Sequence, residues 1–323
     1  MTRRLRAAGW LLPLLAAACA KPAPPVEQAR CAVSLLVLGV AQDAGKPQIG
    51  HPEDPAWADP SRRRLATSLA LIDRRGETPK RWLFEATPDI KDQLYRLDRA
   101  APTESGLGLD GVFLTHAHIG HYAGLMMLGH EAAGAEGVPV YAMPRMTRFL
   151  ADNGPWSQLV TYGNIALTPL AGGAAREIAP EIAVTPFIVP HRDEYSETVG
   201  FRIAGPTKAA VFIPDINSWD AWDEKGSRIE DKVADADFAF LDATFYADGE
   251  LPGRDMSAIP HPRAVETMER FAPLPDAEKA KVRFIHLNHT NPLHAPDAPE
   301  REAVTEAGFG VADEGEVYCL STE

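Results

Sequence analysis

The chain has 323 residues, of which 45% are hydrophobic and 24% are charged, and its formal net charge at pH 7 is −13. This length is enough to bury a core, in one large domain or two smaller ones. A surface that binds a nucleic-acid backbone needs an excess of basic residues, so the acidic balance argues against a nucleic-acid partner.

The first residues have the composition of an export signal. Three arginines within the first six residues precede an apolar run to Leu15 and small residues up to Cys19. The run is too short to span a membrane as a helix. The stretch LLAAACA is similar to a lipobox, in which the cysteine is acylated, although Ala16 stands where a large apolar residue is expected. We predict a signal peptide of the lipoprotein type over 1–18 and lipidation of Cys19, with plain secretion and cleavage nearby as the alternative.

Residues 19–31 are predicted to form a proline-stiffened tether, and residues 32–323 a single domain, because no later segment is long enough to separate two domains. We expect this domain to face the periplasm, with the lipid anchor as its only contact with the membrane. The oligomeric state is left open. Export would place Cys31, at the start of the first predicted strand, and Cys319, in the last one, in an oxidising compartment. If these strands are neighbours the two cysteines can form a disulfide; otherwise they are buried thiols.

After the tether, short β-rich runs alternate with helical stretches. Predicted strands cover 34–40, 68–73, 81–87, 111–116, 139–143, 182–190, 198–205, 209–215, 238–244 and 282–288. Predicted helices cover 89–98, 121–135, 144–152 and 261–272, and Pro144 suits a first helical turn. The pattern indicates an α/β protein with two packed β-sheets and helices outside them.

Polar residues follow the ends of several apolar strands: His116, His191, Asp215, Asp242 and His286. A rigid scaffold presents a site in this way, on loops at one edge of its sheets.

The stretch THAHIGH (115–121) carries the strongest signal for a metal site. Histidines at i and i+2 leaving a strand project to the same side, so His116 and His118 can share one ion, and His121 can reach a second position. His191 can complete the first position, Asp215 can bridge the two, and His286 can join the second. Imidazole and carboxylate ligands suit zinc, iron or manganese, and the lack of thiolates disfavours a closed structural zinc site. The other histidines are interpreted as not binding metal: His51, His130, His261, His289 and His294.

This order of residues resembles the metallo-β-lactamase superfamily, whose strand-end motif is H-x-H-x-D-H. The resemblance implies a four-layer αβ/βα sandwich with metals between the two sheets. Within the superfamily the chain looks most like coenzyme PQQ synthesis protein B and its relatives, from about residue 33 to 320. The stretches that carry this likeness are VLGVAQDAGKPQ, EATPDI, GHYAGL, LDATFYADGE, GRDMSAIPHP and FIHLNHTNP. Such likeness is more specific for ancestry than for activity.

Two departures bear on the metal site. The relatives hold a structural metal with a cysteine cluster after the first glycine loop, and the stretch IGHPEDPAWADPS has no cysteine. The biosynthetic proteins typically lack the first histidines of the motif, whereas this chain keeps His116 and His118. Gly120 stands where two-metal members have an acid. We therefore expect one firmly bound ion and a second that is weak or absent, unless Asp193 or Asp242 compensates.

The leading hypothesis is a metal-dependent hydrolase of a small molecule: an ester, lactone, amide or phosphodiester. An ion would lower the pKa of a bound water to about 7, with Asp215 orienting that water or accepting its proton. His286 would hold a second ion or the developing oxyanion. Further predicted contacts with the substrate or with the ligands are Asp193, Asp242, Thr244, Asn288, His289 and Asn291. The alternatives are an iron-dependent oxidative enzyme linked to PQQ biosynthesis, which the resemblance implies, and a non-catalytic lipoprotein that binds a metal or ligand.

Overall fold

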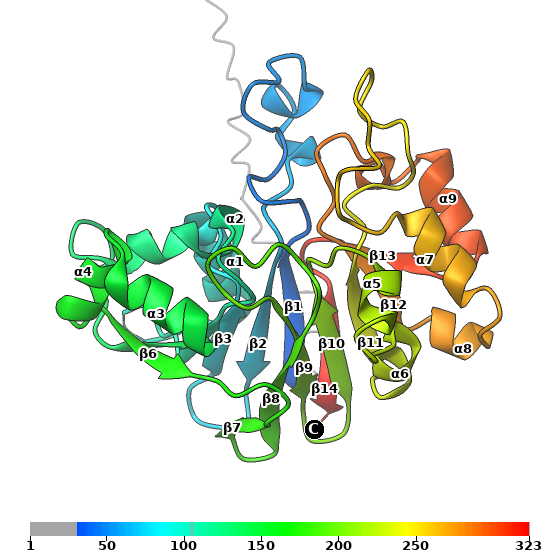
Figure 1. The fold of residues 1–323 in the computed structure, drawn as a ribbon. Coiled ribbons are helices and arrows are strands. Elements are labelled where there is room, and N and C mark those ends of the chain that lie inside the picture. The colour runs from blue at the N-terminus through cyan, green and yellow to red at the C-terminus, as the bar shows by residue number, and fades with distance from the viewer. Residues whose placement is uncertain (1–30, 105, 323) are drawn as a thin grey trace, which may run out of the picture.

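The computed structural model describes residues 31–104 and 106–322, so the predicted signal peptide and Cys19 lie outside the described residues. Two seven-stranded sheets pack face to face, and helices cover both outer faces (Figure 1). This arrangement confirms the predicted four-layer αβ/βα sandwich. No helix in the described ranges is long and apolar enough to cross a membrane.

The first sheet contains the strands from the N-terminal half of the domain together with the last strand of the chain. Its order is β14 (Val317–Thr322), β1 (Cys31–Gly39), β2 (Ser68–Asp73), β3 (Lys80–Phe84), β4 (Gly111–Phe113), β5 (Val138–Ala142) and β6 (Ile165–Pro169). Neighbours from β14 to β3 are antiparallel, and those from β3 to β6 are parallel. Cys31 and Cys319, on adjacent β1 and β14, form a disulfide with a Cα–Cα distance of 5.3 Å.

The second sheet has the same division into parallel and antiparallel halves. Its order is β13 (Gly310–Val311), β12 (Val282–Ile285), β11 (Phe238–Asp242), β10 (Ala209–Ile213), β9 (Val199–Ala204), β8 (Ile182–Ile188) and β7 (Arg176–Ala179). Strands β10 to β13 are parallel, and their near-continuous apolar sequences fit burial on both faces.

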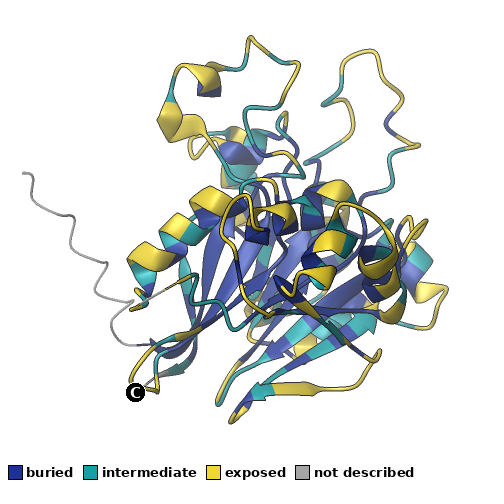
Figure 2. Cartoon of the chain, turned by 90° about the vertical axis from the view of Figure 1, so that its left-hand side faces the viewer, coloured by how far each residue is buried: buried dark blue, intermediate teal, exposed yellow. Residues whose placement is uncertain are grey.

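The core has three layers, because the central strands of each sheet are buried on both faces, whereas β6, β7 and β8 are partly exposed (Figure 2). Between the sheets, Phe84 and Phe113 of the first sheet meet Phe201 and Phe212 of the second. The outer face of the first sheet packs against α1 (Ile90–Ala100), α3 (Pro144–Asp152) and α4 (Trp156–Thr161). The outer face of the second packs against α5 (Trp219–Asp223), α6 (Ile229–Ala234), α7 (Ala264–Phe271) and α9 (Pro299–Glu306). The short α2 (Ile119–Tyr122) and α8 (Asp276–Lys279) complete the α-helices of the described residues.

All ten strands predicted by range are observed and in the predicted order, but most of the predictions run too far at their C-terminal ends, and the described residues form fourteen strands. The prediction for β4 continued to residue 116 and that for β12 to residue 288, whereas the strands end at Phe113 and Ile285. Beyond these ends the sequence is still partly apolar, but the chain leaves the hydrogen-bonded ladder of the sheet and turns. The predicted helix 121–135 is wrong: after α2 the chain forms a 3₁₀ helix to Leu128 and then turns at Gly129. Short elements such as β6, β7 and β13 were not predicted.

Candidate metal centre

The polar strand-end residues gather at one edge of the two sheets. The C-terminal ends of β1, β4, β10, β11 and β12 all lie at this edge, below the long segments 41–66 and 246–262, which are blue and yellow in Figure 1. Parallel strands end at the same edge, so residues far apart in the chain meet there. Many residues of these two segments are exposed, in contrast to the buried strands below them (Figure 2).

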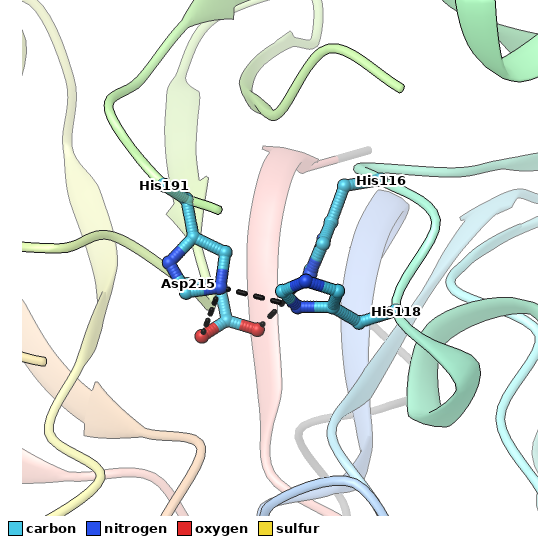
Figure 3. A group of neighbouring side chains, drawn as sticks. All are labelled: His116, His118, His191 and Asp215. Carbon is cyan, nitrogen blue, oxygen red and sulfur yellow. Dashed lines mark hydrogen bonds and ion pairs between the residues drawn. The ribbon is translucent and has the colours of Figure 1, made fainter. Parts of the chain in front are cut away.

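The first group consists of His116, His118, His191 and Asp215 (Figure 3). One ligand atom from each lies within 4.8 Å of all the others. His116 Nε2 is 3.4 Å from Asp215 Oδ2, and His191 Nε2 is 3.6 Å from Asp215 Oδ1. His118 presents its Nδ1 instead, 3.2 Å from His191 Nε2. The structure thus brings together three imidazoles and a carboxylate in the arrangement expected for the first metal position.

Each of these histidines has its other ring nitrogen close to an oxygen atom. The pairs are His116 Nδ1 with Thr115 Oγ1 at 2.8 Å, His118 Nε2 with Glu194 Oε2 at 3.2 Å, and His191 Nδ1 with Asn217 Oδ1 at 3.0 Å. Contacts of this kind orient a metal-binding imidazole and select its tautomer. They were not predicted, because these partners follow no motif of their own.

The second group consists of Asp43, His121, Asp215 and His286. His121 Nε2 lies 2.9 Å from Asp215 Oδ2 and 3.3 Å from Asp43 Oδ1. His286 Nε2 lies 3.6 Å from Asp215 Oδ2 and 3.7 Å from Asp43 Oδ1. Asp215 therefore faces both groups, as a bridging carboxylate would. Asp43 was not predicted as a site residue, although it lies in the stretch VLGVAQDAGKPQ that carries the family likeness, because it lies in a loop beyond the end of β1.

A third group adds His261 to Asp215, Asp242 and His286. His261 Nδ1 is 2.8 Å from Asp242 Oδ2 and 3.2 Å from Asp215 Oδ1. The structure thus places His261, which was interpreted as not binding metal, in contact with two carboxylates of the centre. It was missed because it lies on the loop 246–262, 17 residues after Thr244, whose Oγ1 is 3.1 Å from its Nδ1.

The ligand atoms fit a divalent cation. His116 Nε2, His121 Nε2, His286 Nε2 and Asp215 Oδ1 are buried and have no hydrogen-bond partner within the described residues. Buried polar atoms are nearly always paired, so a cluster of unpaired ones aimed at one space calls for a missing partner. A cation satisfies both nitrogen lone pairs and carboxylate oxygens, and this mixture suits zinc, iron or manganese.

The first three histidines are held in the neutral state that a metal requires. Burial lowers the pKa of His116 well below its ordinary value, lowers that of His118, and lowers that of His191 to about 4. A neutral imidazole can donate its lone pair without first releasing a proton.

The centre as a whole is electronegative. Burial opposes the charged form of His121, but Glu85, Asp215 and Asp43 outweigh it and raise its pKa well above the ordinary value. Burial likewise opposes the charge of Asp215, but the surrounding histidines, led by His286 and His191, hold its pKa well below its usual range. The carboxylates thus keep their charge and attract positive charge into the site.

The remaining predicted contacts are mostly structural. Asp193 is exposed and pairs with Arg145 at 3.7 Å, so the expectation that it might compensate for Gly120 is wrong. Asp242 is fully buried and accepts from the Ile216 and Thr244 N–H groups, besides contacting His261.

Thr244 and residues of the FIHLNHTNP stretch form hydrogen bonds next to the centre. Thr244 Oγ1 lies 3.0 Å from His286 Nδ1 and so orients that ring. Asn291 donates to the Ala243 carbonyl at 2.8 Å, and Asn288 donates to Thr290 Oγ1 at 2.6 Å. His289 packs against His51, with ring centroids 4.3 Å apart and the ring planes tilted by 44°. The predicted role of Thr244 beside the ligands fits this geometry, whereas Asn288, His289 and Asn291 shape the neighbouring loop.

Fold and site together define a metallo-β-lactamase-like protein. The family model for the β-lactamase superfamily domain matches residues 80–305, and the chain belongs to this superfamily. Coenzyme PQQ synthesis protein B of Gluconobacter oxydans (strain 621H) is 27% identical over 319 residues, which cover 90% of this chain and 99% of that protein. The protein of the same name from Methylorubrum extorquens (strain PA1) is 28% identical over 313 residues, covering 87% and 98%. The chain is thus similar to coenzyme PQQ synthesis protein B along almost its whole length.

Two solved structures show the same fold. Zn(2+)-bound PqqB from Methylobacterium extorquens superposes with a TM-score of 0.71 at 24% identity, covering 88% of this chain and 99% of that one. A diphosphatase from the PhnP family superposes with a TM-score of 0.61 at 21% identity, covering 90% and 98%. At these identities the likeness concerns the fold.

Proposed function

We propose that this chain is a metal-dependent hydrolase of a small ester, lactone, amide or phosphodiester. The observation that carries the proposal is the first group: three buried or half-buried imidazoles aimed at one space beside Asp215, each oriented from behind by an oxygen. His118, in this group, and Asp43, beside it, keep 19% and 47% of their side chains exposed, so the centre has a side that solvent reaches. An exposed side of this kind is typical of catalytic metal sites, whereas structural sites are closed.

Different residues of the chain would have different roles in the reaction. His116, His118 and His191 would hold an ion that activates a water molecule and polarises the scissile bond. Asp215, whose two oxygens face both groups of histidines, would orient that water or accept its proton. His286, oriented by Thr244, would bind the developing oxyanion or a second ion. His261, held by Asp242, would donate a proton to the leaving group.

An oxidative iron enzyme is the second candidate. It is favoured by the relatives named coenzyme PQQ synthesis protein B, which match almost the whole chain. Three imidazoles and a carboxylate also suit Fe²⁺.

We also propose export to the periplasm as a lipoprotein. The Cys31–Cys319 disulfide supports it, because structural disulfides persist in oxidising compartments and are rare in the cytosol. Mass spectrometry of the N-terminal peptide tests the anchor: an acylated Cys19 is expected, and a mature chain that begins elsewhere without a lipid would refute it.

Metal analysis followed by a substrate screen tests the function. Protein purified without oxygen should contain zinc or manganese and hydrolyse an ester, lactone or phosphodiester, and the variant His116→Ala/His118→Ala should lose both metal and turnover. His130→Asn, at an exposed histidine outside the centre, is the matched control. Iron with oxygen-dependent turnover would favour the oxidative enzyme. Unchanged metal content in the double variant would refute the assignment of the centre.

A further inference from the structure

We propose that Asp43 supplies the carboxylate that the H-x-H-x-D-H motif places at position 120, so that the chain binds a second divalent ion at Asp43, His121, Asp215 and His286. The absence of a side chain at Gly120 would then make room for Asp43, and would not remove the second metal site. The inference rests on the proposed metal centre but is independent of the reaction catalysed there.

The space beside Gly120 is already filled by Asp43. A Cβ atom added to Gly120 would lie 2.6 Å from Asp43 Cα, 2.6 Å from Asp43 Oδ1 and 2.8 Å from Asp43 Cβ. Such distances are far below van der Waals contact, so a side chain at position 120 and the observed position of Asp43 exclude each other. The carboxylate of Asp43 thus stands where a side chain at position 120 would project.

The Asp43 carboxylate also points at the atoms that need a ligand partner. His121 Nε2 and His286 Nε2 lie 3.3 and 3.7 Å from Asp43 Oδ1, and apart from these ion pairs and those with Asp215 neither nitrogen has a hydrogen-bond partner within the described residues. Contacts at the other nitrogen of each ring orient Nε2 toward Asp43. Glu85 Oε1 lies 3.5 Å from His121 Nδ1, and Thr244 Oγ1 lies 3.0 Å from His286 Nδ1. Two imidazoles and two carboxylates then face one space, and the two negative charges match a divalent ion.

The backbone at this site is held in costly conformations. Four non-glycine residues in the described ranges have positive φ angles, and three of them are Asp43 (36°), Glu85 (76°) and His286 (65°). All three aim their side chains at His121 or at the space beside it. Left-handed backbone at non-glycine residues costs free energy and is found where the surroundings enforce it, often at functional sites.

The loop that carries Asp43 is tied to the strand end that carries His286. The Gln42 N–H donates to the Leu287 carbonyl at 2.8 Å, and the Leu287 N–H donates to the Val40 carbonyl at 2.9 Å. The two ligands are therefore positioned by one hydrogen-bonded unit, although 243 residues separate them in the chain. This rigidity is what a ligand provided by a loop requires in order to hold an ion.

Zinc titration of the full-length chain, stripped of metal with a chelator, tests the proposal by counting ions. Wild type should bind two equivalents of Zn²⁺. Asp43→Asn keeps the shape but removes the charge, and should weaken the second equivalent by on the order of 100-fold while leaving the first unchanged, as loss of even an outer partner costs 10–100-fold. Asp193→Asn, which removes an exposed carboxylate outside the centre, should still bind two.

A second variant removes no ligand at all. Gly120→Ala adds one methyl group that collides with Asp43, so it should weaken the same equivalent of Zn²⁺ by displacing the loop. Gly76→Ala is its control, because an added Cβ there meets only the Thr78 carbonyl at 3.5 Å. Circular dichroism of each variant checks that it remains folded.

The outcomes separate this inference from the proposed function. Wild type that saturates at one equivalent, or Asp43→Asn that binds two as tightly as wild type, would overturn the inference while leaving the first position intact. A wild type that binds no Zn²⁺ would instead overturn the metal centre itself.

Discussion

Glu194 Oε2 lies 3.2 Å from His118 Nε2, the ring nitrogen that faces away from the candidate metal position. Among the three histidines of the first group, His118 is the one with an exposed surface and the one that presents Nδ1 to the others. His116 and His191 are also held by the side chains that bury them. The orientation of His118 therefore depends more strongly on its contact with Glu194.

Replacing Glu194 with glutamine should weaken metal binding without removing a ligand. The loss of a partner behind a metal-binding histidine typically costs 10–100-fold in affinity, so we expect the dissociation constant of the first Zn²⁺ to rise about tenfold or more. Competition with a chromogenic chelator measures it, with Glu177→Gln on the exposed edge strand β7 as the control. An unchanged dissociation constant would show that His118 is oriented by other contacts.

Replacing His261 with asparagine should reduce turnover and leave the metal in place. If His261 donates a proton to the leaving group, its loss should lower kcat by about 10²–10⁴-fold. Metal content and kcat are measured on the same preparation, with His130→Asn as the control. Loss of metal in parallel with kcat would instead make His261 a metal ligand, a role that its 3.2 Å distance to Asp215 also permits.

Breaking the Cys31–Cys319 disulfide should destabilise the domain strongly. The bond joins residues 288 positions apart, and cross-links that close long loops restrict the unfolded chain most. Cys31→Ser/Cys319→Ser should lower the free energy of unfolding by about 2–5 kcal/mol, as measured by chemical denaturation. A reductant should lower the melting temperature of wild type and not that of the variant. Equal melting temperatures of the two proteins without reductant would contradict this expectation.

The ion pair between α6 and α7 should make stability depend on pH. Arg270 contacts both carboxylate oxygens of Glu230, at 2.8 and 2.9 Å. Burial opposes the charge of Glu230, but the hydrogen bonds from Arg270 and Arg228 outweigh it and lower its pKa to about 2. The pKa of Glu230 is lower in the folded chain than in the unfolded chain. The ion pair therefore contributes fully to the free energy of unfolding above pH ~4.3, and this contribution is lost as the pH falls toward 2.

Glu230→Gln should therefore cost about 1 kcal/mol at pH 7, a value reduced by solvent screening, and progressively less as the pH falls below 4. Urea unfolding of wild type and variant across this range, both stripped of metal, measures the difference. A difference that stays constant with pH would show that Glu230 contributes by packing and not by charge.

The sequence alone was sufficient for the fold and for most of the first metal position. Apolar runs of strand length, each ending in a polar residue, predicted the two sheets and the edge at which the site forms. His116 and His118 were predicted as partners because alternate residues leaving a strand project to one side. His191, Asp215 and His286 followed because each ends an apolar run in the order typical of the superfamily.

What only the tertiary structure decided is which loop residues lie in the centre. Asp43 and His261 were missed because loop residues have no periodicity. Asp43 is positioned by its left-handed backbone and by the hydrogen bonds that join Val40 and Gln42 to Leu287, just beyond β12. For the same reason Gly120 looked like a missing ligand, when it marks the space that Asp43 fills. The local pattern determines which side of a strand a histidine faces, but which distant carboxylate shares that space depends on packing between loops.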